Sequence, residues 1–184
     1  MTVPCFFVRD LSIISIMYYK IVEKFGPDNG DRWRDYLQWR GLNLTSFDSV
    51  DGILRPNLFD PESKEDWANC VNENCKLNLI TNINYAKFIL NQYKNAALVG
   101  VNIELDESYT PREGLLGFDI IDGYCDVSLV TNWGADEAGI LNQHIMPNGL
   151  IKDLYQALKI RDLLRKDYSN DSHAGSCEVW AIYN

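Results

Sequence analysis

The hydrophobic pattern of this 184-residue chain changes its period near residue 96. Before that point apolar residues recur at helical spacing, and after it they form short runs rich in β-branched and aromatic residues. Helices followed by a run of strands are typical of the α+β class. We therefore expect N-terminal helices packed on a C-terminal antiparallel sheet of about four strands, with one long helix inserted before the last strand.

Four helices are expected in the first half of the chain. Asp10 is a helix-capping residue, and the apolar stripe that follows runs from Ile14 to Phe25. The turn-forming run at 26–30 breaks this helix, and a second helix begins at Asp31, so the two should form an antiparallel hairpin. The expected helices span residues 10–25, 31–40, a short stretch after 63, and 84–94.

The second half is expected to contribute the sheet. The expected strands span residues 97–105, 115–121, 124–131 and 177–183, with a helix over 150–166 before the last of them. Asp122 and Gly123 stand between the second and third strands and are a signal for a two-residue hairpin. At strand spacing, Asp119 and Asp126 would then lie opposite each other across this turn.

Length and composition fit one folded domain over residues 1–184. The chain is 46% hydrophobic, which supplies a core, and no linker divides it. Its five cysteines are odd in number and scattered, which favours reduced, buried thiols over a disulfide framework or a zinc site. The N-terminal apolar run is interrupted by Arg9 and Asp10, so it fits neither a signal peptide nor a membrane span. We therefore expect a cytoplasmic protein with no membrane partner.

The negative charge is concentrated in one region of the chain. Residues 101–150 hold nine carboxylates and a single base, Arg112, and so carry −8 of the net charge of −9. A one-sided field of this kind attracts cationic partners and repels nucleic acid, whose phosphates require clustered Lys and Arg. The first hypothesis is therefore binding to a basic protein surface, with no direct contact to nucleic acid.

Aromatic residues are interleaved with these carboxylates. Tyr109, Phe118, Tyr124 and Trp133 are of the kinds that anchor the centres of interfaces. Packing in the core of the sheet explains each aromatic separately, but the combination of acids and aromatics favours an interface. The expected partner-binding residues are Glu104, Asp106, Glu107, Glu113, Asp119, Asp122, Tyr124, Asp126, Trp133, Asp136 and Glu137.

A small hydrolase is the alternative hypothesis. Asp119, Asp122 and Asp126 are the densest carboxylate group, and such a group could bind a divalent ion or cleave a glycosidic bond. Turn formation explains the same residues without a function, because Asp is a preferred turn residue.

Other catalytic patterns have no support in the sequence. His144 and His173 stand in no nucleophile motif, and the possible thiol Cys125 is followed by Asp126, which would raise its pKa. The glycine runs lack both the Lys and the spacing of a phosphate-binding loop. We therefore expect no catalytic residue, no metal and no cofactor.

The overall character of the chain resembles the immunity proteins of bacterial contact-dependent inhibition and polymorphic toxin systems. The stretches that carry this resemblance lie at residues 33–37 (WRDYL), 47–51 (FDSVD), 63–67 (SKEDW) and 116–122 (LGFDIID). They match no universal motif, so no functional residue is carried over from those families.

The resemblance implies a tight, stoichiometric complex with a cognate toxin domain. A nuclease fits best, because its substrate-binding cleft must be basic, and RNase toxins, including the uridylate-specific endoribonuclease class, would be natural partners. Carboxylates that mimic phosphates would cover the cleft and exclude the substrate. A DNA-mimic regulator of some other nucleic-acid enzyme is a further possibility, which would require carboxylates spaced like duplex phosphates.

Overall fold

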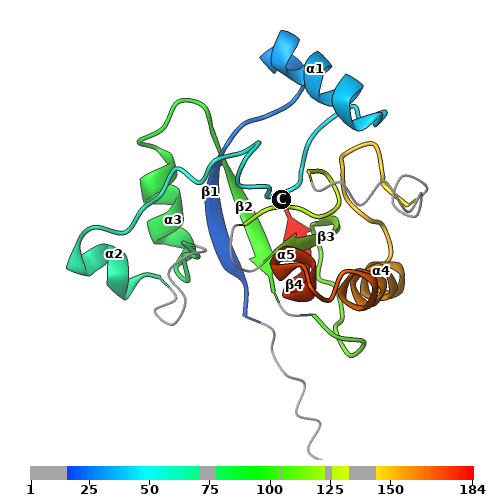
Figure 1. The fold of residues 1–184 in the computed structure, drawn as a ribbon. Coiled ribbons are helices and arrows are strands. Elements are labelled where there is room, and N and C mark those ends of the chain that lie inside the picture. Colours follow the sequence, from blue (N-terminus) through cyan, green and yellow to red (C-terminus); the bar gives the residue numbers. More distant parts are fainter. Residues whose placement is uncertain (1–15, 71–77, 104, 123–125, 133–143) are drawn as a thin grey trace, which may run out of the picture.

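The computed structural model describes residues 16–70, 78–103, 105–122, 126–132 and 144–184. The elements in chain order are β1 (Tyr18–Glu23), the 3₁₀ helix η1 (Pro27–Asn29), α1 (Asp31–Arg40), α2 (Lys64–Ala68), α3 (Ile83–Leu90), β2 (Ala96–Asn102), β3 (Leu115–Asp122), α4 (Leu154–Asp167), α5 (Ser172–Gly175) and β4 (Cys177–Tyr183). The four strands form one sheet in the order β1-β2-β4-β3, and every neighbouring pair is antiparallel (Figure 1). The α+β class and the four-stranded antiparallel sheet are thus confirmed.

The first strand replaces an expected helix. The described part of the 10–25 segment forms β1, which pairs with β2 from Tyr18 opposite Val101 to Glu23 opposite Ala96. Its adjacent residues Ile21 and Val22 are both fully buried, because the two faces of this strand are both covered. The helical prediction and the helical hairpin were therefore wrong.

The expected third strand and its two-residue turn were also wrong. β3 pairs with β4 along its whole length, and Ile121 faces Ser128 only in an isolated bridge. The amide of Asp122 donates to the carbonyl of Val127, so the connection at Gly123 is wider than two residues. Residues 123–125 lie outside the described residues.

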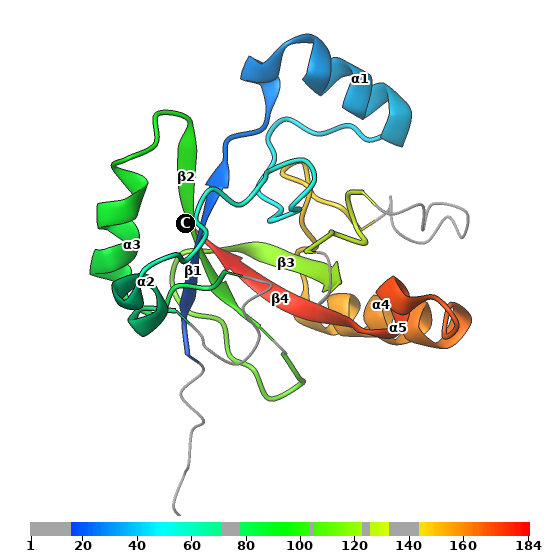
Figure 2. The same cartoon turned by 60° about the vertical axis from the view of Figure 1, so that its left-hand side comes forward.

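One face of the sheet is covered by helices. α3 packs against β1 and β2, while α4 packs against β3 and β4 at the other end of the sheet (Figures 1 and 2). Phe118 and Ile120 of β3 meet Ala157, Leu158 and Ile160 of α4 in this layer. None of the described helices is long and apolar enough to cross a membrane.

The opposite face of the sheet is covered by loops. Val50, Leu79 and Leu150 come from three separate loops and pack on this face. The sheet residues that they cover are Val22, Val99, Val101, Ile121, Trp180 and Ile182. Loops that cover a sheet must satisfy their own backbone polar groups, and this requirement shapes the site described below.

Helix α1 lies away from the sheet, on an aromatic core of its own (Figures 1 and 2). The ring of Phe25 makes edge contacts with Trp33, Tyr36 and Phe47, at centroid distances of 5.4, 5.5 and 5.2 Å. The helix ends at Gly41, whose φ of 64° is left-handed, so the expected C-terminal stop is confirmed.

Gly117 is a position where no side chain fits. Its φ is +152°, and an added Cβ would come within 2.7 Å of the Met146 methyl and 2.8 Å of the Leu150 Cβ. We expect Gly117→Ala to lower the free energy of unfolding by roughly 1–3 kcal/mol, the usual cost of overpacking. Urea denaturation would measure this loss. Gly26→Ala is the matched control, because an added Cβ there meets nothing within 4 Å, and an equal loss in both variants would contradict the prediction.

Candidate functional site

The carboxylates that the sequence singled out separate into buried and exposed groups. Asp119 and Asp122 are fully buried and Asp126 is 9% exposed, so the expectation that these three face a partner was wrong. The reason is that each finds an internal partner. The loop between β2 and β3 carries exposed Asp106, Glu107 and Glu113. The remaining expected residues, Glu104, Tyr124, Trp133, Asp136 and Glu137, lie outside the described residues.

Asp119 of β3 is held by two serines from different loops. Its carboxylate accepts hydrogen bonds from Ser49 Oγ and from Ser128 Oγ, both at 2.6 Å. Thr131 Oγ1 in turn donates to Ser49 Oγ at 3.3 Å. Asp119 therefore ties the loop at 47–55 and the loop at 126–132 to the sheet.

Asp51 performs a similar task from the loop side. Its carboxylate accepts from the backbone amides of Leu54 at 2.8 Å and Ser128 at 2.8 Å, and from the side-chain amide of Asn132 at 3.1 Å. These bonds satisfy donors that the loops would otherwise bury without partners. Asp51 and Asp119 thus act as a structural link between the two loops.

Burial perturbs the protonation of both carboxyl groups. Desolvation raises the pKa of Asp119 to about 7, against the opposing effect of the hydrogen bonds from Ser128 and Ser49. Desolvation also raises the pKa of Asp51, and the backbone amide of Leu54 acts in the opposite direction. Asp119 is therefore a carboxyl group that takes up its proton near neutral pH.

Asp126 pairs with the fully buried Lys20 across the same face of the sheet. The Lys20 ammonium also lies 5.8 Å from the centroid of the Trp180 ring. Asp126 adopts a φ of +60°, and its backbone carbonyl accepts from the amide of Gly52 at 2.6 Å. Its Oδ1 has no hydrogen-bond partner among the described residues. The ion pair ties the loop at 126–132 to β1.

Asp122, at the end of β3, bonds to the short helix α5. Its Oδ2 lies 2.5 Å from His173 Nδ1, and this hydrogen bond raises the pKa of His173. Ser176 Oγ donates to the other oxygen at 3.4 Å. The carboxylate orients the imidazole as in many catalytic or metal sites, but it also links α5 to the sheet.

The three aspartates do not form one chemical site. Asp119 and Asp122 are three positions apart on a strand, so their side chains leave opposite faces of the sheet. Each has different partners, and the described residues hold no group of three metal-ligating side chains. A shared metal or acid–base site at Asp119, Asp122 and Asp126 therefore has no geometric basis here.

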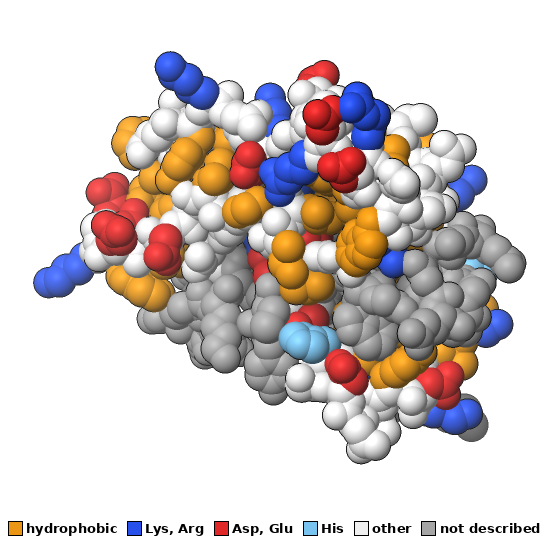
Figure 3. Space-filling model, turned by 45° about the horizontal axis from the view of Figure 1, so that its top comes forward, with side chains coloured by type: hydrophobic (Ala, Val, Ile, Leu, Met, Phe, Trp, Pro, Cys, Tyr) orange, Lys and Arg blue, Asp and Glu red, His pale blue; other side chains and the backbone are white. Residues whose placement is uncertain are grey.

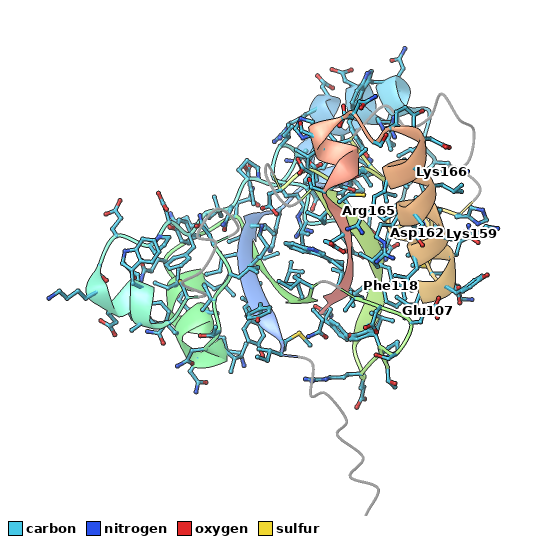
Figure 4. All side chains as sticks on the ribbon, turned by 60° about the horizontal axis from the view of Figure 1, so that its bottom comes forward. Glu107, Phe118, Lys159, Asp162, Arg165 and Lys166 are labelled. Atoms are coloured by element: carbon cyan, nitrogen blue, oxygen red, sulfur yellow. The ribbon has the colours of Figure 1, made fainter. Side chains whose placement is uncertain are left out.

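The exposed carboxylates of the β2–β3 loop lie beside α4. Arg161 of α4 donates to the Leu105 carbonyl at 3.2 Å and holds this loop against the helix. Glu107 lies near the helix that carries Lys159, Asp162 and Lys166 (Figure 4). The carboxylate of Glu107 therefore stands at the surface, next to a helix of mixed charge.

Of the expected aromatic anchors, the structure describes Phe118 and Tyr109, and both have partners inside the fold. Phe118 is 2% exposed in the core, and the Tyr109 hydroxyl donates to Asn102 Oδ1 at 2.7 Å. Large aromatic side chains are exposed elsewhere, on α1, α2, α3 and α4. On the lobe formed by α2 and α3, acidic side chains lie next to hydrophobic ones (Figure 3, left).

Several residues of these sites carry no signal in the sequence. Lys20 stands inside the apolar run at 18–22, and Ser49 and Asp51 stand in a segment without a recognised motif. Lys20 and its partner Asp126 are 106 residues apart in the sequence, and Ser49 and its partner Asp119 are 70 residues apart. Only the tertiary fold brings such distant positions together.

Comparison of this chain with protein-family models, with curated proteins and with solved structures found no match. The functional argument therefore rests on the residues of this chain alone.

The raised pKa of Asp119 makes stability depend on pH. Between the ordinary value of 3.8 and about 7, the folded chain binds a proton that the unfolded chain has released. This contribution is present in full below the ordinary pKa and is lost as pH rises through the folded pKa. We expect the free energy of unfolding to fall by roughly 2–4 kcal/mol more in the wild type than in Asp119→Asn between about pH 4 and pH 8.

Urea denaturation at a series of pH values would measure this difference. Parallel pH profiles for the two proteins would show that Asp119 titrates normally in the folded state.

The Lys20–Asp126 pair should be costly to break from one side. Lys20→Met leaves the carboxylate of Asp126 buried without its counter-charge, so we expect a loss of roughly 3–5 kcal/mol in the free energy of unfolding. The double variant Lys20→Met/Asp126→Asn should recover part of this loss, because no unpaired charge remains. Chemical denaturation of both variants checks this, and a single variant as stable as the wild type would rule out a stabilising role for the pair.

Proposed function

We propose that this chain binds a basic protein and neutralises it, and that the partner is a nuclease toxin of a contact-dependent inhibition or polymorphic toxin system. The observation that supports the proposal most is that exposed carboxylates still outnumber exposed basic groups in the folded chain. Burial withdraws four carboxylates and three basic groups from the surface of the described residues, so the excess of carboxylates is nearly unchanged.

The buried and exposed carboxylates have different roles in this proposal. Asp51, Asp119, Asp122 and Asp126 are used inside the fold, and they are not available to a partner. The partner-binding role passes to the exposed carboxylates Asp106, Glu107 and Glu113 of the β2–β3 loop. A nuclease must hold phosphates in a basic cleft, and carboxylates at the mouth of that cleft would exclude the substrate.

Charge of this kind acts first on association. Long-range attraction raises the rate at which the two proteins meet, and salt screens it over about 10 Å. Tight binding further requires desolvated anchors at the centre of the interface. The proposal therefore separates carboxylates that steer the partner from side chains that hold it.

The hydrolase alternative draws no support from this geometry. Asp122 points to the opposite face of the sheet from Asp119 and Asp126, and the three carboxylates bond to different internal partners. The His173–Asp122 pair has a catalytic appearance, but the hydroxyl beside it, Ser176 Oγ, donates to the Ser172 carbonyl at 2.7 Å. Its Ser176 neighbour donates to the same carboxylate as the histidine contacts.

Reversing exposed carboxylates tests the proposed function. Glu107→Lys/Glu113→Lys should slow association with a basic partner several-fold at low salt, and the difference should shrink as salt is raised. The measurement is surface plasmon resonance at two salt concentrations, with the purified product of the reading frame directly upstream of this gene as the probe.

Asp28→Lys/Asp35→Lys is the matched control, because both residues are also exposed and the double reversal changes the net charge by the same amount. Circular dichroism would verify folding of each variant. Absence of any complex between the wild type and the probe, or equal effects of all reversals regardless of salt, would count against the proposed function.

A further inference from the structure

Two large aromatic side chains stand exposed on the lobe formed by α2 and α3. Phe88 of α3 is 61% exposed and Trp67 of α2 is 37% exposed. Burial of such side chains against a partner contributes more binding free energy than burial of most others, and Trp is among the residues enriched in binding hot spots. Neither side chain is needed to fill one of the buried cores of the molecule.

A chain of contacts between the helices supports Phe88 and ties α3 to the helix that carries Trp67. The Tyr85 hydroxyl donates to the carboxylate of Asp66 on α2, and the Tyr85 ring lies 6.2 Å from that of Phe88. Asp66 is itself fixed, because it forms a capping box with Ser63 at the start of α2. A surface that is already ordered loses little conformational entropy when it binds.

The segment that leads into α2 is predominantly acidic, although Lys64 stands three residues before Trp67 and so shares its side of α2. Residues 60–66 hold four carboxylates and a single base, Lys64. Glu62 and Glu65 are exposed, and Figure 3 shows acidic side chains gathered on this lobe beside hydrophobic ones. The lysine on α3, Lys87, is two residues from Tyr85 and therefore points to a different side of the helix from Tyr85 and Phe88.

We propose that Trp67 and Phe88, together with the exposed carboxylates Glu62 and Glu65 of the same lobe, form the contact surface for the basic protein partner. This inference rests on the proposed function and assigns the anchoring part of that interaction to the α2–α3 lobe. Apolar anchors fit an apolar depression on the partner, and the neighbouring carboxylates pair with Lys or Arg around its edge. Phosphate-bearing ligands do not fit, because the same carboxylates repel them.

The lobe is separate from the exposed loop that carries Glu107. In both ribbon views α2 and α3 lie at one side of the sheet, and the loop between β2 and β3 lies away from them (Figures 1 and 2). The anchoring and steering roles are therefore separable by mutation. Loss of an anchor should speed dissociation, whereas loss of a steering charge should slow association.

The test compares truncations of exposed aromatic side chains. Trp67→Ala and Phe88→Ala should each raise the Kd for the upstream gene product about ten-fold or more, chiefly by faster dissociation. Trp39→Ala on α1 is the matched control, since Trp39 is 63% exposed on a different lobe, and it should change the Kd less than two-fold. Glu62→Lys/Glu65→Lys should weaken binding in a salt-dependent way. Circular dichroism and thermal unfolding would verify that each variant folds.

The outcomes distinguish this inference from the proposed function. If the wild type binds the probe but Trp67→Ala and Phe88→Ala bind as tightly, the inference is overturned and the proposed function stands. If Trp39→Ala weakens the complex as much as the α2–α3 variants, the contact surface lies elsewhere and the inference is again overturned. If the wild type does not bind the probe at all, both fail together.

Discussion

The loop-covered face of the sheet depends on hydrogen bonds to buried carboxylates. Asp119 from β3 and Asp51 from the facing loop both bond to Ser128, the first to its hydroxyl and the second to its amide. Without these acceptors the two loops would bury backbone and hydroxyl groups that have no partner, at a cost of about 1–3 kcal/mol each. The arrangement lets loops, in place of helices, cover half of the core.

This use of carboxylates separates two kinds of acidic residue that look alike in the sequence. The carboxylates of β3 and of the loops that face the sheet, Asp51, Asp119, Asp122 and Asp126, are internal, and their pairing with Ser, Lys20 or His173 determines the shape of the fold. Those of the β2–β3 loop and of the segment before α2 remain at the surface. The net charge of the molecule is therefore a surface property even though its densest carboxylate group is not.

The distribution of exposed aromatics follows the same division. Around the internal carboxylates, Phe118 and Trp180 are used for packing and for contact with Lys20. At the α2–α3 lobe the aromatic side chain remains exposed: Tyr85 bonds to Asp66, and the neighbouring Phe88 stays in solvent. An acid beside an aromatic thus gives internal support in one place and stands at an exposed surface in the other, and the accessibility of the pair distinguishes them.

By itself the sequence determined those features that depend on nearest neighbours along the chain. The stop of α1 at Gly41, the capping box before α2 and the strand at 177–183 are each specified by local conformational preference and hydrogen bonding. Tertiary structure alone decided that the segment at 18–23 is a strand, because its apolar residues fit both periods until β2 pairs with it. It also decided which carboxylates are buried, since burying a charge requires partners such as Lys20 that only the folded chain brings within reach.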